Sequence, residues 1–193
     1  MASNRVSSTE LATIGSLPVY GVIKEIRLFV KKTPPQQMWV DLNELIGETI
    51  ALVHRELLRN QVALQTDLAA DLPAVLGDRV QLQQVLLNLI LNGLEAMTAV
   101  TDRPRELLIS SQRQPGANGV LVAVRDCGAG IEPHNLDRLF DAFFTTKPQG
   151  MGLGLSIGRS IIMAHGGQLW AAPNADHGAT FQFTVPANSE STL

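Results

Sequence analysis

The sequence predicts an α/β sandwich, in which helices cover one face of a mixed β-sheet. Apolar residues make up 45% of the 193 residues, which is enough to build a hydrophobic core. Segments with helical periodicity alternate along the chain with short segments typical of strands. Some predicted strands nevertheless follow one another directly, and these adjacent strands favour a mixed sheet over a purely parallel one.

A polar N-terminal tail is followed by a predicted amphipathic helix that lies ahead of the main domain. Over residues 19–30, apolar residues recur at helical spacing, and Pro34 and Pro35 stop the pattern. No neighbouring segment completes a core with this helix, so we expect its apolar stripe to dock on the main domain or on another chain. The predicted division is a tail and helix over 1–36, a main domain over 37–187 and a C-terminal tail over 188–193.

The strands of the main domain are predicted from short apolar or alternating segments. In chain order they are MWVDL (38–42), VALQTDL (62–68), ELLISSQ (106–112), GVLVAVRD (119–126), QLWAA (168–172) and ATFQFTV (179–185). The segment LPAVLGD (72–78) is predicted to close with a turn. QPGAN, between the third and fourth predicted strands, is typical of a hairpin connection.

The helices are predicted from apolar residues at helical spacing and from the signals at their ends. The first follows Asp41 or Asn43, either of which can cap it, and runs to about Asn60. Its inward-facing residues are predicted to be Leu45, Ile46, Ile50, Leu52, Val53, Leu57 and Leu58. Three further helices are predicted over 79–100, 135–140 and 153–165, with Gly166-Gly167 ending the last.

Composition and charge exclude several classes of protein. The net charge is −3 and no basic cluster exceeds the pair Lys31-Lys32, so we expect no nucleic-acid partner. Cys127 is the only cysteine, which excludes an intramolecular disulfide and a multi-cysteine metal site. The sequence begins without the apolar region of a signal peptide, and no apolar run is long enough for a membrane span. We therefore expect a cytoplasmic chain without a membrane segment.

The segment DRVQLQQVLLNLILNGLEAM (78–97) predicts an apolar helix that carries a stripe of polar residues. The stripe consists of Gln81, Gln84, Asn88, Asn92 and Glu95, at spacings that place them on one face. A solvated face usually carries Lys and Glu, whereas this stripe carries amides ahead of Glu95. An amide oxygen can bind a hard cation, and an amide NH2 group can donate to phosphate. From the stripe alone, a solvated face and the lining of a ligand cavity stay equally open.

Two other stretches have candidate binding residues. Asp126 follows an apolar predicted strand and begins DCGAG; its carboxylate can accept from an exocyclic amine, although a plain strand-to-loop turn is the simpler interpretation. KPQGMGLGLSIGRS (147–160) leads into a helix, whose first N–H groups can hold an anion, and a surface loop is the alternative. This stretch matches neither a P-loop nor a dinucleotide-binding fingerprint, because the lysine precedes the glycines and the glycine spacing differs.

Taken together and in order, these motifs resemble the N, G1, F and G2 boxes of the histidine kinase ATP-binding domain, which belongs to the GHKL superfamily. The matching stretches are NLILN (88–92), DCGAG (126–130), FDAFF (140–144) and GMGLG (150–154). The resemblance covers about residues 39–186. The residues of these motifs look particularly like those of the oxygen- and nitrogen-sensing bacterial sensor kinases. The resemblance implies a Bergerat-type fold, to which the helix predicted over residues 19–30 would be an N-terminal addition.

The resemblance also implies an Mg-ATP site. Asn92 would coordinate Mg2+, Asp126 would accept from the adenine amino group, and Thr180 would support the adenine pocket. The residues implied to bind the nucleotide are Asn88, Asn92, Asp126, Gly128, Gly130, Lys147, Gly150, Gly152, Leu153, Gly154 and Thr180. Asn88, Asn92 and Lys147 are also implied to act in catalysis. Because Asn88 stands where gyrase-like relatives have a glutamate base, the resemblance favours phosphotransfer over ATP hydrolysis.

The implied activity is histidine protein kinase activity, with transfer of the γ-phosphoryl group of ATP to a histidine. None of the histidines, at 54, 134, 165 and 177, precedes the ATP domain, so we expect a separate dimerisation domain to supply the acceptor. A response regulator would be the next partner, and residues 19–30 could join two copies of the chain. His165 is expected to end a helix rather than to react. The alternatives are a nucleotide-binding module without phosphotransfer and a serine kinase of the anti-sigma type.

Overall fold

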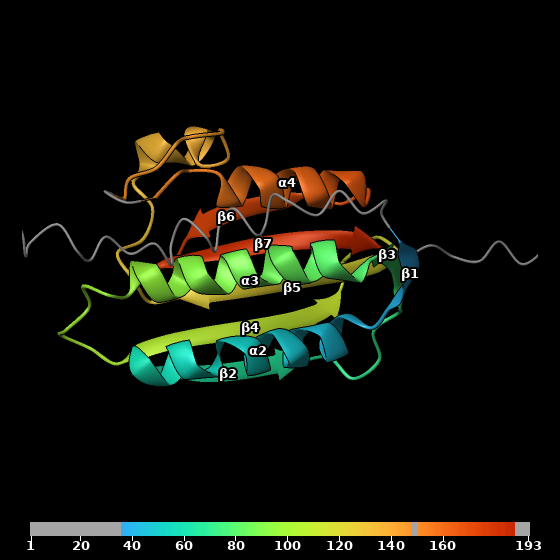
Figure 1. Ribbon diagram of the computed structural model, residues 1–193, viewed down its shortest axis with the longest axis horizontal. Helices are drawn as coiled ribbons and strands as arrows, with labels where there is room; N and C mark the ends of the chain where they lie inside the picture. The colour runs from blue at the N-terminus through green and yellow to red at the C-terminus, as the bar shows by residue number, and fades with distance from the viewer. Residues whose placement is uncertain (1–35, 148–149, 188–193) are drawn as a thin grey trace, which may run out of the picture. The chain divides into compact units, whose positions relative to one another are not determined.

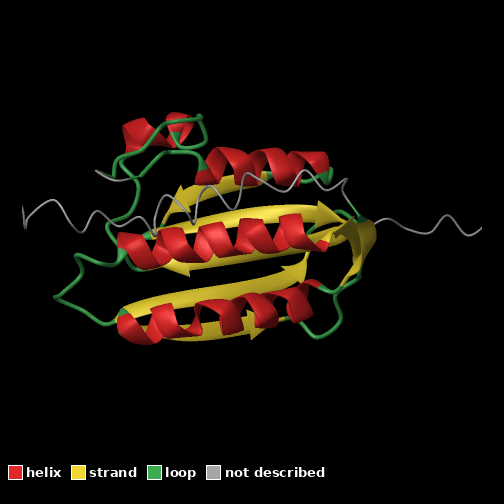
Figure 2. Cartoon of the chain, viewed as in Figure 1, coloured by secondary structure: helices red, strands yellow, loops and turns green. Residues whose placement is uncertain are grey.

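The structure is a computed structural model that describes residues 36–147 and 150–187 (Figure 1). A five-stranded sheet in the order β2-β4-β5-β7-β6 forms one layer, and helices α2, α3 and α4 cover one of its faces (Figure 2). Strand β2 pairs with β4 in parallel, whereas the other pairs in this sheet are antiparallel. The predicted α/β sandwich with a mixed sheet is confirmed. The predicted helix over 19–30 lies outside the described residues.

The predicted strands and helices of the main domain are present, with small shifts at their ends. The strands are β1 Gln37–Val40, β2 Val62–Leu68, β3 Val75–Asp78, β4 Arg105–Arg113, β5 Gly119–Asp126, β6 Leu169–Pro173 and β7 Ala179–Pro186. The helices are α2 Leu42–Arg59, α3 Arg79–Ala96 and α4 Gly154–Ala164, and η1 Pro133–Arg138 is a 3-10 helix. Among the described residues, no helix is long and apolar enough to cross a membrane.

The turn predicted at the end of residues 72–78 was wrong. Residues Val75–Asp78 form β3, which pairs antiparallel with β1 in a separate two-stranded sheet. The pairing joins Val40 to Val75, positions far apart in the sequence, so local turn residues alone could not reveal it.

Asp41, one of the two cap residues predicted for helix α2, is its N-cap. The Asp41 carboxylate accepts from the N–H groups of Asn43 and Glu44, at 2.8 and 3.2 Å. The predicted inward positions Leu52 and Leu58 were wrong, because these side chains are 64% and 65% exposed. The buried stripe of α2 consists instead of Leu42, Leu45, Ile46, Thr49, Val53 and Leu57.

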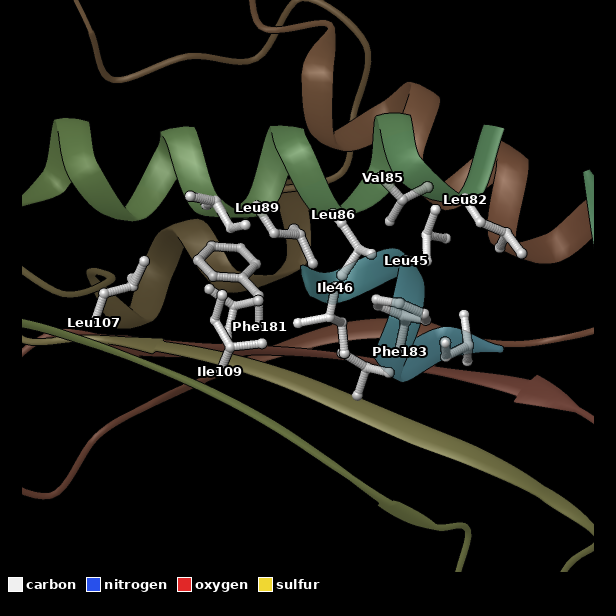
Figure 3. Close-up of a cluster of buried hydrophobic side chains, with 14 of the residues drawn as sticks. Leu45, Ile46, Leu82, Val85, Leu86, Leu89, Leu107, Ile109, Phe181 and Phe183 are labelled. Atoms are coloured by element: carbon white, nitrogen blue, oxygen red, sulfur yellow. The ribbon is translucent and has the colours of Figure 1, made fainter. Parts of the chain in front are cut away.

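The core lies between α2, α3 and the sheet (Figure 3). Apolar side chains of both helices gather there with apolar side chains of β4 and β7. The labelled members are Leu45, Ile46, Leu82, Val85, Leu86, Leu89, Leu107, Ile109, Phe181 and Phe183. Because α3 directs this apolar face to the sheet, its asparagines lie on the remaining faces, within reach of the loops around it.

The C-terminus of α4 confirms the role expected for His165. His165 is the C-cap residue, and Gly166 follows with a φ of 74°, the left-handed conformation that glycine favours. The His165 ring also bridges two elements: Nδ1 lies 2.8 Å from the carbonyl oxygen of Ile161, and Nε2 accepts from the N–H of Asp78 at 2.9 Å. Both ring nitrogens of His165 therefore have structural partners.

Candidate functional site

The residues that the sequence singled out gather around the C-terminal half of α3. The carboxyl end of β5 and the C-terminal end of α3 lie at the same side of the domain (Figure 1). The Lys147 ammonium donates to Asn92 Oδ1 at 3.0 Å, which ties the segment ahead of α4 to α3. A Cβ atom added to Gly93 would lie 3.4 Å from Cβ of Asp126, so the end of β5 packs directly beneath α3. The three sequence motifs therefore surround one region.

The two asparagines of α3 differ in environment. Asn88 is only 8% exposed, and its amide nitrogen donates to the carbonyl oxygen of Gly154 at 3.2 Å, at the start of α4. Asn92, one turn further along α3, is partly buried and presents its amide oxygen to Lys147. Asn88 thus positions α4 relative to α3, whereas the Asn92 oxygen faces a cation.

The Lys147 ammonium that contacts Asn92 also contacts the Glu95 carboxylate, which the sequence did not single out for binding. The Lys147 ammonium lies 2.6 Å from the Glu95 carboxylate and 3.0 Å from the Asn92 amide oxygen. Glu95 belongs to the polar stripe on α3, so its position was visible in the sequence, but its pairing with Lys147 was not. An amide oxygen beside a carboxylate is the kind of hard-oxygen set that Mg2+ prefers, and the lysine shows that a positive charge fits there.

Asp126 is a buried carboxylate at the end of β5. It is 3% exposed, and its Oδ1 atom accepts from the N–H groups of Gly128 and Ala179, at 2.8 and 3.4 Å. Burial raises the pKa of Asp126, against the opposing effect of these two N–H groups and of the Lys147 charge. Both of these bonds use Oδ1, and neither uses Oδ2.

The glycines after Asp126 are required by close packing, Gly128 against α3 and Gly130 against Gly178 ahead of β7. A Cβ atom added to Gly128 would lie 2.6 Å from the carbonyl oxygen of Ala96, the last residue of α3. The N–H of Ala129 donates to the same carbonyl oxygen at 3.2 Å. Gly130 adopts a φ of 79° and approaches the carbonyl oxygen of Gly178, to which an added Cβ would come within 3.2 Å. These contacts fix the path of the loop beside the Asp126 carboxylate.

Gly152, ahead of α4, is required by its contacts with the phenylalanine motif. Gly152 has a φ of 67°, and a Cβ atom there would lie 2.5 Å from the carbonyl oxygen of Phe144. The N–H of Phe143 donates to the carbonyl oxygen of Gly152 at 2.9 Å. Leu153 is the N-cap residue of α4, and Gly154 is its first residue. The start of α4 therefore lies beside Asn88 of α3.

Thr180 acts on Asp126 through a residue that the sequence did not single out. The Thr180 hydroxyl donates to Oδ1 of Asn174 at 2.6 Å. The amide nitrogen of Asn174 donates to the backbone carbonyl oxygens of Asp126 and His177, both at 2.8 Å. Asn174 lies in the turn between β6 and β7, where asparagine is common for local reasons, so no sequence signal marked it.

Within residues 36–147 and 150–187, no group of three or more His, Cys, Asp or Glu side chains could hold a metal ion. A cation at Asn92 would therefore complete its coordination with oxygens of another ligand, as Mg2+ does with nucleotide phosphates.

Comparison with known proteins identifies relatives of the whole described domain. The family model described as "Histidine kinase-, DNA gyrase B-, and HSP90-like ATPase" matches residues 77–189. The sensor protein FixL of Bradyrhizobium diazoefficiens is 42% identical over 185 residues, which is 95% of this chain and 36% of that protein. The sensor protein TdiS of Thauera aromatica is 36% identical over 165 residues, or 86% of this chain and 30% of that protein. The chain thus spans only about a third of the length of these relatives.

Solved structures agree with the sequence relatives. The catalytic domain of the histidine kinase ThkA is 34% identical with a TM-score of 0.69, and the match covers 78% of this chain and 95% of that domain. A structure of ThkA in complex with the response regulator protein TrrA is 31% identical with a TM-score of 0.71, over 89% of this chain and 48% of that one.

Proposed function

The chain belongs to the family of histidine kinase-, DNA gyrase B- and HSP90-like ATPases, and from this premise we propose that it is the Mg-ATP-binding catalytic domain of a bacterial two-component sensor histidine kinase. The matched sensor proteins and the ThkA catalytic domain support the kinase class. The observation that carries the proposal is the convergence of Asn92, Lys147 and Asp126 around α3, because it provides an oxygen for a cation, a charge for phosphate and an acceptor for the base.

The adenine base is recognised at Asp126. The Oδ2 atom of this carboxylate accepts a hydrogen bond from the adenine amino group, while the bonds from Gly128 and Ala179 hold Oδ1. A site that directs a buried acceptor at an N–H group discriminates strongly against a base that lacks it, since the acceptor would be left unpaired.

The triphosphate lies between α3 and the start of α4. Asn92 Oδ1 ligates Mg2+, and the ion supplies charge neutralisation to the phosphates when it is bound. The same Asn92 oxygen accepts from the Lys147 ammonium in this structure, and with a metal ion at Asn92 the Lys147 ammonium would be available to the phosphates. The segment 150–154 and the first N–H groups of α4 complete the phosphate contacts.

Catalysis is a matter of positioning and charge rather than of proton transfer by the domain. The Asn88 amide cannot accept a proton, and its nitrogen is already bonded to Gly154. The γ-phosphoryl group passes to an imidazole nitrogen, with cleavage of the P–O bond, release of ADP and loss of the imidazole proton. Because both ring nitrogens of His165 have structural partners, His165 is not the acceptor.

The acceptor histidine comes from a dimerisation domain, in the same protein or in another chain. A response regulator then receives the phosphoryl group, and the ThkA–TrrA complex of a relative supports this class of partner. We place the domain in the bacterial cytoplasm, and we propose residues 19–30 as the segment through which two copies associate.

Incubation with γ-labelled ATP and an isolated histidine-bearing dimerisation domain tests the proposal. The proposal predicts acid-labile label on the acceptor, Mg2+ dependence, and loss of labelling in Asn92→Ala. ATP binding with no labelled acceptor would favour a binding module, and acid-stable label would favour a serine kinase. Labelling by Asn92→Ala at the wild-type rate would contradict the assignment of the metal ligand.

A further inference from the structure

Asn174 lies at the point where the pairing of β5 with β7 stops. The register of these strands ends at the pair of Arg125 and Thr180, so the carbonyl oxygen of Asp126 lies beyond the last pair. This carbonyl oxygen accepts from the Asn174 amide nitrogen at 2.8 Å. The N–H of Ala179 donates instead to the Asp126 carboxylate. Asn174 therefore satisfies the backbone of Asp126 while a β7 N–H group serves its side chain.

The orientation of the Asn174 amide is fixed by its neighbours. Its nitrogen faces two carbonyl oxygens, those of Asp126 and His177, which can only accept. Its oxygen therefore faces the Thr180 hydroxyl, which donates at 2.6 Å. These bonds on both sides of the amide link Thr180 of β7 to the backbone of Asp126.

The turn that carries Asn174 is pressed against the same carbonyl group. The N–H of Asn174 donates to the carbonyl oxygen of Gly178 at 3.1 Å, which closes the turn. Gly178 has a φ of 80°, and an added Cβ atom would clash with the carbonyl oxygen of Asp126. The Asp126 carbonyl group is thus held by a hydrogen bond from Asn174 and by the close approach of the Gly178 backbone. Together these two contacts leave Asp126 little freedom to shift.

We infer that Asn174 is a positioning residue for nucleobase recognition. Its hydrogen bond to the Asp126 carbonyl oxygen fixes the backbone of Asp126 and so sets where the Asp126 carboxylate meets the base. This inference rests on the proposed function, since it requires that Asp126 bind the adenine amino group. Thr180 acts in the same relay, one step further from the base. Without the Asn174 amide, the Asp126 carboxylate is still present but is free to move away from the base.

Nucleotide discrimination tests this role, because a residue that only stabilises the turn would not change it. The affinities of ATP and of purine riboside triphosphate, which is ATP without the amino group, are measured by calorimetric titration with Mg2+. The wild-type protein should prefer ATP. Asn174→Ala and the isosteric Asn174→Asp, which lacks the N–H donor, should each reduce this preference about threefold to tenfold, the range of one hydrogen bond. In an Asp126→Asn background, Asn174→Ala should change the preference no further.

Asn118 offers a matched control at the opposite end of the sheet. Its amide nitrogen donates to the carbonyl oxygen of Ala187 at 2.9 Å, so Asn118→Ala loses the same kind of bond away from Asp126. Asn118→Ala should keep the wild-type preference for ATP. An unchanged preference in both Asn174 variants would overturn the inference while the proposed function stands. Failure of the wild-type protein to bind ATP would overturn the proposed function itself.

Discussion

Replacement of Asp126 by asparagine should weaken nucleotide binding without weakening the fold. Asp126 is 3% exposed, and burial raises its pKa more than its N–H partners and Lys147 lower it. The folded protein therefore holds the Asp126 proton more tightly than the unfolded chain does, and the ionised carboxylate reduces the free energy of unfolding at neutral pH. Asparagine keeps an oxygen for Gly128 and Ala179 and removes the buried charge. The free energy of unfolding should therefore stay the same or rise.

The expected loss of affinity follows from the burial of Asp126. A hydrogen bond to a charged acceptor is worth about 1.5 to 3 kcal/mol, and water has little access to replace it at this site. This range corresponds to an increase of about 10-fold to 150-fold in the dissociation constant of Mg-ATP. The side-chain NH2 group of asparagine would also face the adenine amino group, which favours the upper part of the range.

Thermal unfolding at a series of pH values and calorimetric titration with Mg-ATP measure the two effects. Relative to Asp126→Asn, the wild-type protein should lose stability as the pH rises from the ordinary carboxyl pKa of about 3.9 through the raised pKa of Asp126. Asp67→Asn, at an exposed carboxylate in β2, is the control and should change neither property. A destabilised Asp126→Asn that binds Mg-ATP as well as the wild type would refute the reasoning.

Three further predictions concern Lys147 and two glycines. Lys147→Ala should weaken Mg-ATP binding about twofold to fivefold, because the lysine side chain is 40% exposed and water screens its interactions; a calorimetric titration that finds the wild-type affinity would argue against a phosphate contact. Gly152→Ala should lower the free energy of unfolding by more than about 1 kcal/mol, since its φ of 67° and its contact with Phe144 leave no place for a methyl group. Gly47→Ala, in the middle of α2 where nothing lies within 4 Å of an added Cβ, should instead raise it by about 0.5 to 1 kcal/mol in denaturant unfolding. If both alanine variants changed stability in the same direction, the backbone argument for Gly152 would fail.

Much of the fold could be predicted because its signals are local. Helical spacing and end residues located α2, α3 and α4, and short apolar segments located the five strands of the main sheet. Leu52 and Leu58 were placed wrongly because hydrophobicity alone does not say which face of α2 meets the sheet. Strand β3 was missed because its partner β1 is distant in the sequence.

The site shows the same division between local and distant signals. The motif residues stood out because their types and spacings are unusual, as with the asparagines of an apolar helix. The contacts of Lys147 with Asn92 and Glu95 join residues more than fifty positions apart, and no local pattern encodes them. The role of Asn174 could not be predicted for a different reason, since asparagine is common in turns and its presence there indicates no further function.

Titration of the protein with ATP in the presence and absence of Mg2+, for the wild type and for Asn92→Ala, tests the central claim most directly. If Asn92 is the metal ligand of an Mg-ATP site, Mg2+ should strengthen ATP binding to the wild type and should have little effect on binding to the variant. Wild-type binding that is indifferent to Mg2+, or an equal Mg2+ effect in Asn92→Ala, would contradict the account.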